Sequence, residues 1–444
     1  MQGVKKPCFQ AGQKGPRCEA REKATSGGVL KEYVGARRSS ATKQMGLFQQ
    51  SVMGASQEAP KVLTVLHLID MLGRGGAERR LINDLKYLDR NRIRSIVCSV
   101  SPPQDLADEV EALHVPWHCL DTSTARAPAK RFSRLIALLR KYRVDILHTQ
   151  LFAAGVYGRL ARLLFRRLIL VSTLQSSTYE PGTEYHYSAK RRLIDSLMGN
   201  WCNDAFVAVS AFVKDSAVRN LRLPDVKITV IPNSVDAEAF QEPDPKVIAR
   251  KRAEFGILPE DKVLVTVGRL DPAKGHRYLL ESLPDVRRFF PKVKLLIVGD
   301  GPSRSSLEEL GRQTGNGGNV LFSGIRQDVR EILSLCDIFV FPTLSEGLPV
   351  ALLEAMVLKR PCVASRIPPV EEVIQEGVSG FLVPPRSPAS LAETIVRLLL
   401  NPRQREEVGI RAWETVRERF SARKSTQALQ VLYETLAEKH QTSV

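Results

Sequence analysis

The 444-residue chain lacks the long apolar run that a membrane-spanning helix needs, since no uninterrupted apolar stretch approaches about 18 residues. Its seven cysteines include no C-x-x-C pair, which argues against a structural zinc site and suits a reducing compartment. The N-terminus has no apolar core of the length that a secretory signal needs. We therefore expect a cytoplasmic protein that crosses no membrane by a helix.

Apolar residues make up 43% of the sequence, so the chain can bury hydrophobic cores, and its length suits two or three domains of about 150 residues. Residues 1–60 differ from the rest because they are rich in Gly, Ser, Gln and Lys and show no apolar period. We expect them to form a disordered basic extension.

Apolar, strand-like runs alternate with helical stretches twice along the chain, and this pattern is typical of parallel sheets covered on both faces. The sequence therefore predicts an α/β fold with two doubly wound, Rossmann-like domains facing across an interdomain cleft. The predicted strands are 62–69, 93–100, 115–120, 144–149, 168–174, 205–209 and 227–231, then 263–269, 294–300, 319–324, 338–343 and 361–366. The predicted parts are an N-terminal domain (61–236), a linker (237–260), a C-terminal domain (261–420) and a final helix and tail (421–444).

Two cations follow the first strand of the second series. Arg269 stands at the predicted strand end, and Lys274 comes five residues later, just before a helix. An Arg fork, a Lys point charge and free backbone N–H groups at a helix N-terminus suit a pyrophosphate. Charge alone fits two solvated surface cations equally well.

Two glutamates separated by seven residues follow the run IFVFP. Pro349 suits the first position of a helix, which places Glu346 in the preceding loop and Glu354 inside the helix. Glu354 is embedded in VALLEAMVL, and a carboxylate buried there needs a partner. A ribose diol, with two O–H donors, is one such partner, and a backbone group or an arginine is another.

These motifs occur together in a recognisable order. The run E-G-L-P-x-x-L-L-E-A (346–355) is preceded by G-R-L-x-x-x-K-G (268–275) and followed by G-x-S-G-F-L-V-P-P (377–385). This combination resembles the retaining glycosyltransferases of family four, which have the GT-B fold and an E-x7-E motif. Five further stretches match the family: GRGGAE (73–78), VAVSAFV (207–213), VIPNSVD (230–236), VGDGP (298–302) and FSGIRQDV (322–329).

The resemblance implies a role for each matching residue. Arg269 and Lys274 would bind the donor diphosphate, Glu354 the nucleotide ribose, and Glu346 the hydroxyls of the transferred sugar. The remaining donor contacts would come from the backbone of Gly347, Leu348, Pro349 and Val350 at the helix N-terminus, from Ile325 and Arg326 near the base, and from Gly75 and Gly76 after the first strand.

The family retains the configuration of the transferred sugar, and its leaving phosphate is usually described as helping to deprotonate the acceptor. The protein then supplies positioning and cations on the departing diphosphate. No D-x-D triplet occurs in the sequence, so we expect no metal-diphosphate clamp and no cofactor. The resemblance thus implies a metal-independent hexosyltransferase that acts on a glycan or lipid-linked acceptor, as in cell-surface polysaccharide synthesis.

The chain departs from the family in its first half. Members often carry H-x-H where this sequence has His148-Thr149-Gln150, and a histidine in the region of Gln175. Glutamine can bond a sugar hydroxyl but carries no proton at neutral pH. Contacts of His148, Gln150 and Gln175 with sugar or acceptor are therefore one expectation, and a structural role for His148 is the other. A catalytically weakened nucleotide-sugar or glycan-binding subunit is the alternative function.

The net charge of +17 comes mostly from the first half, where residues 126–167 contain eleven basic residues and one acid. The apolar residues at helical spacing in this segment fit two sheet-packing helices with solvated cations. They also fit attachment to an anionic membrane surface, which would make the protein peripheral on the inner face of the membrane. No nucleic-acid partner is expected, because that function leaves both glutamates and the Arg/Lys pair unexplained.

Overall fold

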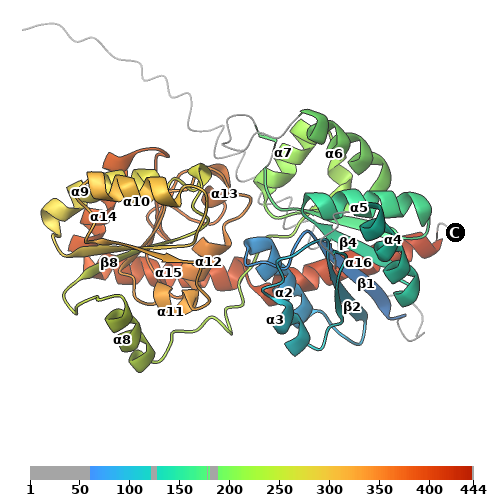
Figure 1. Ribbon diagram of the computed structural model, residues 1–444, viewed down its shortest axis with the longest axis horizontal. Coiled ribbons are helices and arrows are strands. Elements are labelled where there is room, and N and C mark those ends of the chain that lie inside the picture. Colours follow the sequence, from blue (N-terminus) through green and yellow to red (C-terminus); the bar gives the residue numbers. More distant parts are fainter. Residues whose placement is uncertain (1–60, 122–127, 178, 181–188, 443–444) are drawn as a thin grey trace, which may run out of the picture. The chain divides into compact units, whose positions relative to one another are not determined.

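The computed structural model describes residues 61–442 except 122–127, 178 and 181–188 (Figure 1). Residues 1–60, for which the sequence predicts disorder, lie outside the described residues. In the described part of the chain, no helix combines the length and the apolar character that crossing a membrane requires.

The first sheet is built from the apolar runs before residue 231, and all of its paired strands are parallel. Its described strands number seven, in the order β3-β2-β1-β4-β5-β6-β7. The order reverses between β1 and β4, the point where doubly wound sheets bind ligands. The strands are β1 (Leu63–Ile69), β2 (Ile93–Ser99), β3 (Trp117–Cys119), β4 (Ile146–Gln150), β5 (Ile169–Leu174), β6 (Ala205–Ala208) and β7 (Ile228–Val230).

Helices connect these strands as the alternating pattern predicts. They are α2 (Gly76–Tyr87), α3 (Ala107–Ala112), α4 (Pro128–Tyr142), α5 (Phe152–Leu164), α6 (Ala189–Cys202), α7 (Ala211–Leu221) and the 3-10 turn η1 (Asp225–Lys227).

The second sheet is also parallel throughout, with six described strands in the order β10-β9-β8-β11-β12-β13. Its order reverses between β8 and β11. The strands are β8 (Lys262–Val267), β9 (Val293–Val298), β10 (Val320–Gly324), β11 (Ile338–Phe341), β12 (Cys362–Ser365) and β13 (Phe381–Val383). The helices are α8 (Pro245–Glu254), η2 (Pro272–Lys274), α9 (His276–Phe289), α10 (Arg304–Gln313), α11 (Val329–Leu333), α12 (Val350–Val357), α13 (Pro368–Glu371), α14 (Pro388–Leu400), α15 (Pro402–Arg419) and α16 (Ala422–Thr442).

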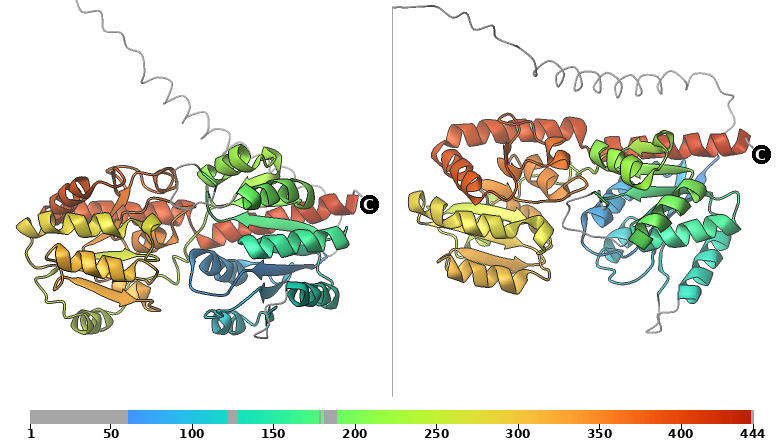
Figure 2. Two further views of the ribbon diagram at one scale, coloured as in Figure 1. Left: turned by 45° about the horizontal axis from the view of Figure 1, so that its top comes forward. Right: turned by 90° about the horizontal axis from the view of Figure 1, so that it is seen from above.

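Alternation along the buried strands sends side chains to both faces of each sheet. In β1, Leu66 and Leu68 pack toward α4 and α5, whereas Leu63 and Val65 pack toward Tyr433 of α16. The last helix of the chain therefore returns to the first sheet, and its red ribbon can be followed there in Figures 1 and 2. A separate buried cluster joins β6 and α7 of the first half to α12 and α15 of the second.

The predicted α/β fold with two Rossmann-like sheets is confirmed, and three details differ. Strand β13 was not predicted, because three residues between Gly380 and a Pro-Pro pair give too short a pattern to recognise. The last part (421–444), predicted as a helix and a tail, is helical from Ala422 to Thr442, and α14 and α15 precede it with breaks at Asn401 and Phe420. The predicted linker contains α8, which Asp244 caps through a 2.7 Å bond from the Lys246 N–H.

Candidate functional site

The structure brings Lys274 and Glu346 together at the switch point of the second sheet. Lys274 ends η2 after β8, Glu346 lies in the loop after β11, and β8 and β11 are neighbouring strands. The Lys274 Nζ lies 2.6 Å from Glu346 Oε1, and Thr343 Oγ1 donates to the same oxygen over 2.9 Å. The predicted phosphate cation and the predicted sugar contact are therefore hydrogen-bonded to each other.

Gly275 allows the loops after β8 and β11 to approach each other. Its φ of 64° lies in the left-handed region, and a Cβ built there would be 2.0 Å from the carbonyl oxygen of Pro342. Only glycine avoids both the strain and the collision. The second glycine of the G-R-L-x-x-x-K-G motif thus sets the separation between Lys274 and the end of β11.

Arg269 lies at the same sheet edge but stays in solvent. Its side chain is 68% exposed, and its ion pair with Asp271 is long, at 3.8 Å between Nε and Oδ2. Such a pair contributes little to stability because water screens it. The Arg269 guanidinium therefore remains accessible to an anionic ligand.

Glu354 lies in α12, where Pro349 is the N-cap and Val350 the first helical residue, one position later than the sequence predicted. The side chain is half-buried, and no described residue donates a hydrogen bond to it. Burial raises the pKa of Glu354 from 4.5 to about 7, and the positive charge of Arg79 opposes this shift in part. A ligand that donates hydrogen bonds would satisfy this carboxylate.

Arg79 is a site residue that the sequence analysis missed. It lies one turn into α2, and Glu109 of α3 holds its guanidinium through bonds of 2.6 and 3.3 Å. Its position one turn after the paired glycines of GRGGAE was the available signal. Arg79 brings a cation of the first half close enough to influence Glu354.

The two predicted glycines begin α2. Gly75 is the N-cap in an extended conformation, with φ −121°, and Gly76 is the first helical residue. A Cβ on Gly76 would lie 3.3 Å from Cγ2 of Val350. The helix N-terminus after β1 thus contacts the start of α12, which bears Glu354.

The residues expected near the base follow β10. Ile325 is 69% exposed. The Arg326 guanidinium bonds Asp328 (2.7 and 2.8 Å) and Glu254 (2.7 Å) and lies over the Phe255 ring. Because Arg326 pairs with these two acids, which also pair with Lys251, its side chain is engaged with α8, and Ile325 is the freer of the two.

His148 points into the interior of the protein. Its Nδ1 lies 2.5 Å from the hydroxyl of Tyr433 in α16, and its Nε2 lies 2.7 Å from Thr173 Oγ1 in β5. Burial, together with the nearby His67 and Arg80, lowers its pKa well below the ordinary value. In this structure His148 therefore has the structural role that was the second expectation, and it reaches no open cleft.

Gln150 and Gln175 contact each other across neighbouring strands. Gln150 ends β4 and is buried, and its Oε1 accepts a 3.2 Å bond from Gln175 Nε2. The backbone of Gln175 also lies against Gly347 of the loop after β11. The two side-chain amides that were predicted to contact sugar are therefore hydrogen-bonded to each other in this structure.

The basic segment divides into described helices and Arg126, which lies outside the described residues. The buried face of α4 contributes Leu135 and Leu139 to the core, as the sheet-packing interpretation expects. Several of the cations have local partners: Arg131 with Asp121, Arg134 with the Leu120 carbonyl (2.6 Å), Arg159 with Asp195 (2.6 Å) and Arg162 with Asp204 (3.4 Å).

Exposed apolar side chains occur on both α5 and α6, and Asp195 of α6 pairs with Arg159 of α5. Leu193, Leu197 and Trp201 recur every four residues, so they share one face of α6, and Trp201 is 88% exposed. We refer to the exposed apolar residues of the two helices together as the α5–α6 patch: Leu160, Leu163, Leu164, Leu193, Ile194, Leu197 and Trp201. Exposed cations lie in or next to these helices: Arg166, Arg167, Lys190 and Arg192.

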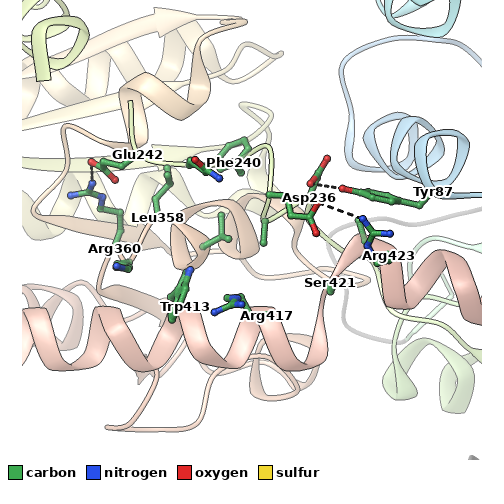
Figure 3. Close-up of a pocket in the computed structure, with 16 residues that line it drawn as sticks. Tyr87, Asp236, Phe240, Glu242, Leu358, Arg360, Trp413, Arg417, Ser421 and Arg423 are labelled. Carbon is green, nitrogen blue, oxygen red and sulfur yellow. Dashed lines mark hydrogen bonds and ion pairs between the residues drawn. The ribbon is translucent and has the colours of Figure 1, made fainter. Parts of the chain in front are cut away.

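A pocket of about 800 Å³ lies elsewhere, between the segment 236–242, the end of α12 and the junction of α15 with α16 (Figure 3). Tyr87 and Lys86 bond Asp236 at one end, and Arg360 pairs with Glu242 at the other. None of the predicted site residues lines this pocket. We therefore place the candidate site at the strand ends and not in this pocket.

Two family models match successive parts of the chain. The model described as Glycosyltransferase Family 4 matches residues 74–239, and the model described as Glycosyl transferases group 1 matches residues 247–415. Together they span most of the described residues, with one model for each sheet.

Similar proteins include the UDP-Gal:alpha-D-GlcNAc-diphosphoundecaprenol alpha-1,3-galactosyltransferase of Escherichia coli, 28% identical over 349 residues, which are 76% of this chain and 88% of that protein. The N-acetyl-alpha-D-glucosaminyl L-malate synthase of Bacillus anthracis is 26% identical over 68% of this chain and 77% of that protein. Among solved structures, HepE of Anabaena in complex with UDP and glucose is 22% identical. Its TM-score is 0.74, over 85% of this chain and 100% of that chain. The structural likeness supports the GT-B fold.

Proposed function

We propose that the chain is a retaining, metal-independent hexosyltransferase that uses a nucleotide sugar, because the models described as Glycosyltransferase Family 4 and Glycosyl transferases group 1 match its two halves in succession. The acceptor we propose is a glycan or a lipid-linked sugar, as the name of the E. coli relative states for that protein. The observation that carries the proposal is the half-buried carboxylate of Glu354, to which no described residue donates a hydrogen bond. It lies in α12, the helix that follows the loop of Glu346, and Glu346 is bonded to Lys274.

The proposed chemistry assigns each charged group one task. The bond between the sugar carbon and the donor phosphate breaks, and its electron pair leaves with the nucleoside diphosphate. The acceptor oxygen attacks the same face of the sugar, and its proton passes to the leaving phosphate. Arg269 and Lys274 stabilise the charge that develops on the diphosphate, and this electrostatic effect is often the largest in such reactions.

Donor binding then exchanges the partners seen in the free protein. Lys274 leaves Glu346 for the diphosphate, and the Glu346 carboxylate becomes available to hydroxyls of the sugar. The exchange leaves Lys274 paired with the diphosphate and Glu346 hydrogen-bonded to sugar hydroxyls, so neither partly buried ion is left without a partner. Glu354 accepts the two ribose hydroxyls.

A thermal-shift panel of nucleotide sugars tests the donor class, because a ligand that binds the folded state raises the melting temperature. Arg269→Ala should reduce donor affinity or turnover by about 10- to 100-fold, the range of a lost charge-assisted contact. The matched control is Arg277→Ala, which removes an arginine that is 70% exposed on α9 and pairs with Glu281. Equal donor affinity and turnover in both variants and the wild type would remove the assignment. Activity that survives a chelator supports metal independence, and activity lost to it refutes that part.

We also propose that the enzyme works at the inner face of a membrane, docked through the α5–α6 patch. Seven exposed apolar residues with adjacent cations suit an anionic lipid surface, where each basic residue contributes about 1 kcal/mol. Trp201→Ser with Leu197→Ser should abolish sedimentation with phosphatidylglycerol vesicles, whereas the control Leu258→Ser, at a residue 53% exposed in the second half, should not. Equal sedimentation of both variants, or self-association that the double variant abolishes, would refute membrane docking.

The alternative function, a catalytically weakened binding subunit, is favoured by one observation. The Gln150–Gln175 pair and the buried His148 leave no imidazole at the ends of β4 and β5 that would be protonated near neutral pH. Gln175→His distinguishes the two functions. A large gain in transfer rate supports the weakened subunit, and no gain supports a native glutamine in an active enzyme.

A further inference from the structure

Two motifs that the proposed chemistry leaves unused, VAVSAFV (207–213) and VIPNSVD (230–236), meet at the loop that bears Glu346. Ser210 Oγ donates to the carbonyl oxygen of Gly347 over 2.7 Å, and Asn233 Nδ2 donates to that of Leu348 over 3.1 Å. Ser210 is fully buried and Asn233 is 4% exposed. Side chains of the first half therefore hold two consecutive peptide groups of the second.

The orientation of Ser210 is fixed from its own side. Ser210 is the N-cap of α7, and its Oγ accepts a 3.1 Å bond from the Val213 N–H. Because that bond uses a lone pair, the hydroxyl proton is available for Gly347. The backbone of Gln175 packs closely against the same loop. A Cβ on Gly347 would lie 2.0 Å from the Gln175 carbonyl oxygen.

A held carbonyl also directs the N–H of the next residue. In a trans peptide the C=O and the following N–H point in opposite directions. With the Gly347 carbonyl turned to Ser210, the Leu348 N–H faces away from Ser210, where no described group accepts it. Asn233 Oδ1, a side-chain atom of the same contact, is buried without a partner among the described residues. Buried polar groups without partners are costly, so an arrangement that keeps them points to a ligand.

We propose that Ser210 and Asn233 are positioning residues for sugar transfer. By holding the carbonyls of Gly347 and Leu348, they aim the Leu348 N–H at the donor and fix the backbone next to Glu346. The inference rests on the proposed function and deepens it, because it makes the sugar-binding loop depend on contacts from both halves. Neither Ser210 nor Asn233 has a described hydrogen bond with Arg269 or Glu354, the residues assigned to the nucleotide.

The test uses Asn233→Asp, which replaces the donating amide by an oxygen that repels the Leu348 carbonyl, and Ser210→Ala. Each should lower kcat by about tenfold or more, the effect of one or two misdirected hydrogen bonds. The affinity for the free nucleoside diphosphate should stay within about twofold of the wild type. Ser210→Thr, which keeps the hydroxyl, should restore most of the rate.

Ser387→Ala is the matched control for loss of a helix cap, because Ser387 caps α14 through the Ser390 N–H and makes no contact with this loop. It should lower the melting temperature without the loss in kcat. If Ser210→Ala and Asn233→Asp behave like this control, the clamp is refuted. If the wild type transfers no sugar, the proposed function fails. The clamp is then judged by melting shifts, because its variants should lose any extra stabilisation that a nucleotide sugar gives over the nucleotide, and equal shifts would overturn it.

Discussion

Replacing Glu354 by glutamine separates the two demands on this side chain, stability of the free protein and affinity for the donor. The carboxyl group is half-buried, and its pKa of about 7 exceeds the ordinary value of 4.5. Between these two values the folded state holds a proton that the unfolded state has lost. The contribution of Glu354 to stability is therefore fully present below pH 4.5, falls as the pH rises, and is lost above about 7.

The magnitude follows from the same shift. Complete withdrawal from water would make the ionised form about 3 kcal/mol less favourable in the folded state, and partial exposure reduces this to about 1–2 kcal/mol. Glu354→Gln removes the ionisation, so at pH 8 the variant should be more stable than the wild type by that amount. In a chain of this size, the change corresponds to a rise of about 1–3 °C in melting temperature.

The affinity should change in the opposite direction. A carboxylate accepts both hydroxyls of a ribose, whereas a glutamine has only one acceptor oxygen, so the donor should bind about 30-fold more weakly. Melting curves at pH 5 and pH 8, each with and without a nucleoside diphosphate, measure both effects. A variant that is less stable than the wild type at pH 8, or that binds the nucleotide equally well, would refute our account of Glu354.

Three further predictions concern neighbouring contacts. Gly347→Ala should abolish transfer and lower the melting temperature, because its Cβ would collide with the Gln175 backbone, as kinetics and calorimetry will measure. Tyr433→Phe should destabilise the protein by about 1–2 kcal/mol in urea, since it leaves His148 Nδ1 buried without a partner, and it should leave the pH profile of transfer unchanged. Lys274→Ala should lower kcat by about 10- to 100-fold, and a larger effect on the donor KM than on kcat would refute its role on the leaving phosphate.

Much of the fold was predictable because buried parallel strands leave continuous apolar runs in the sequence. Each of the twelve predicted strand positions overlaps an observed strand, and among the strands of the described residues only β13 escaped the pattern. The meeting of Lys274 with Glu346 follows from the order of strands, since β8 and β11 are neighbours in a doubly wound sheet. The sequence also indicated that Glu354 needs a partner.

Contacts between the two halves were not predictable from periodicity. Arg79, Ser210 and Asn233 lie in recognised motifs, but their roles depend on which loop of the other half reaches them. His148 shows the same limit. A contact with sugar or acceptor was one expectation for it, and the return of α16 explains why it is buried instead. Tertiary contacts of this kind join residues hundreds of positions apart.

The return of α16 has a consequence for how the protein is synthesised. Leu429 and Tyr433 cover Leu63 and Val65 of the first strand, and Thr426 bonds Asp84 over 3.1 Å. The part of the first sheet's face around Leu63 and Val65 therefore stays uncovered by α16 while the ribosome translates more than three hundred codons, a time of tens of seconds at about 5–20 residues per second. During that interval the nascent chain exposes an apolar surface that is prone to aggregation. Chaperones that bind such surfaces would protect it until the last helix emerges.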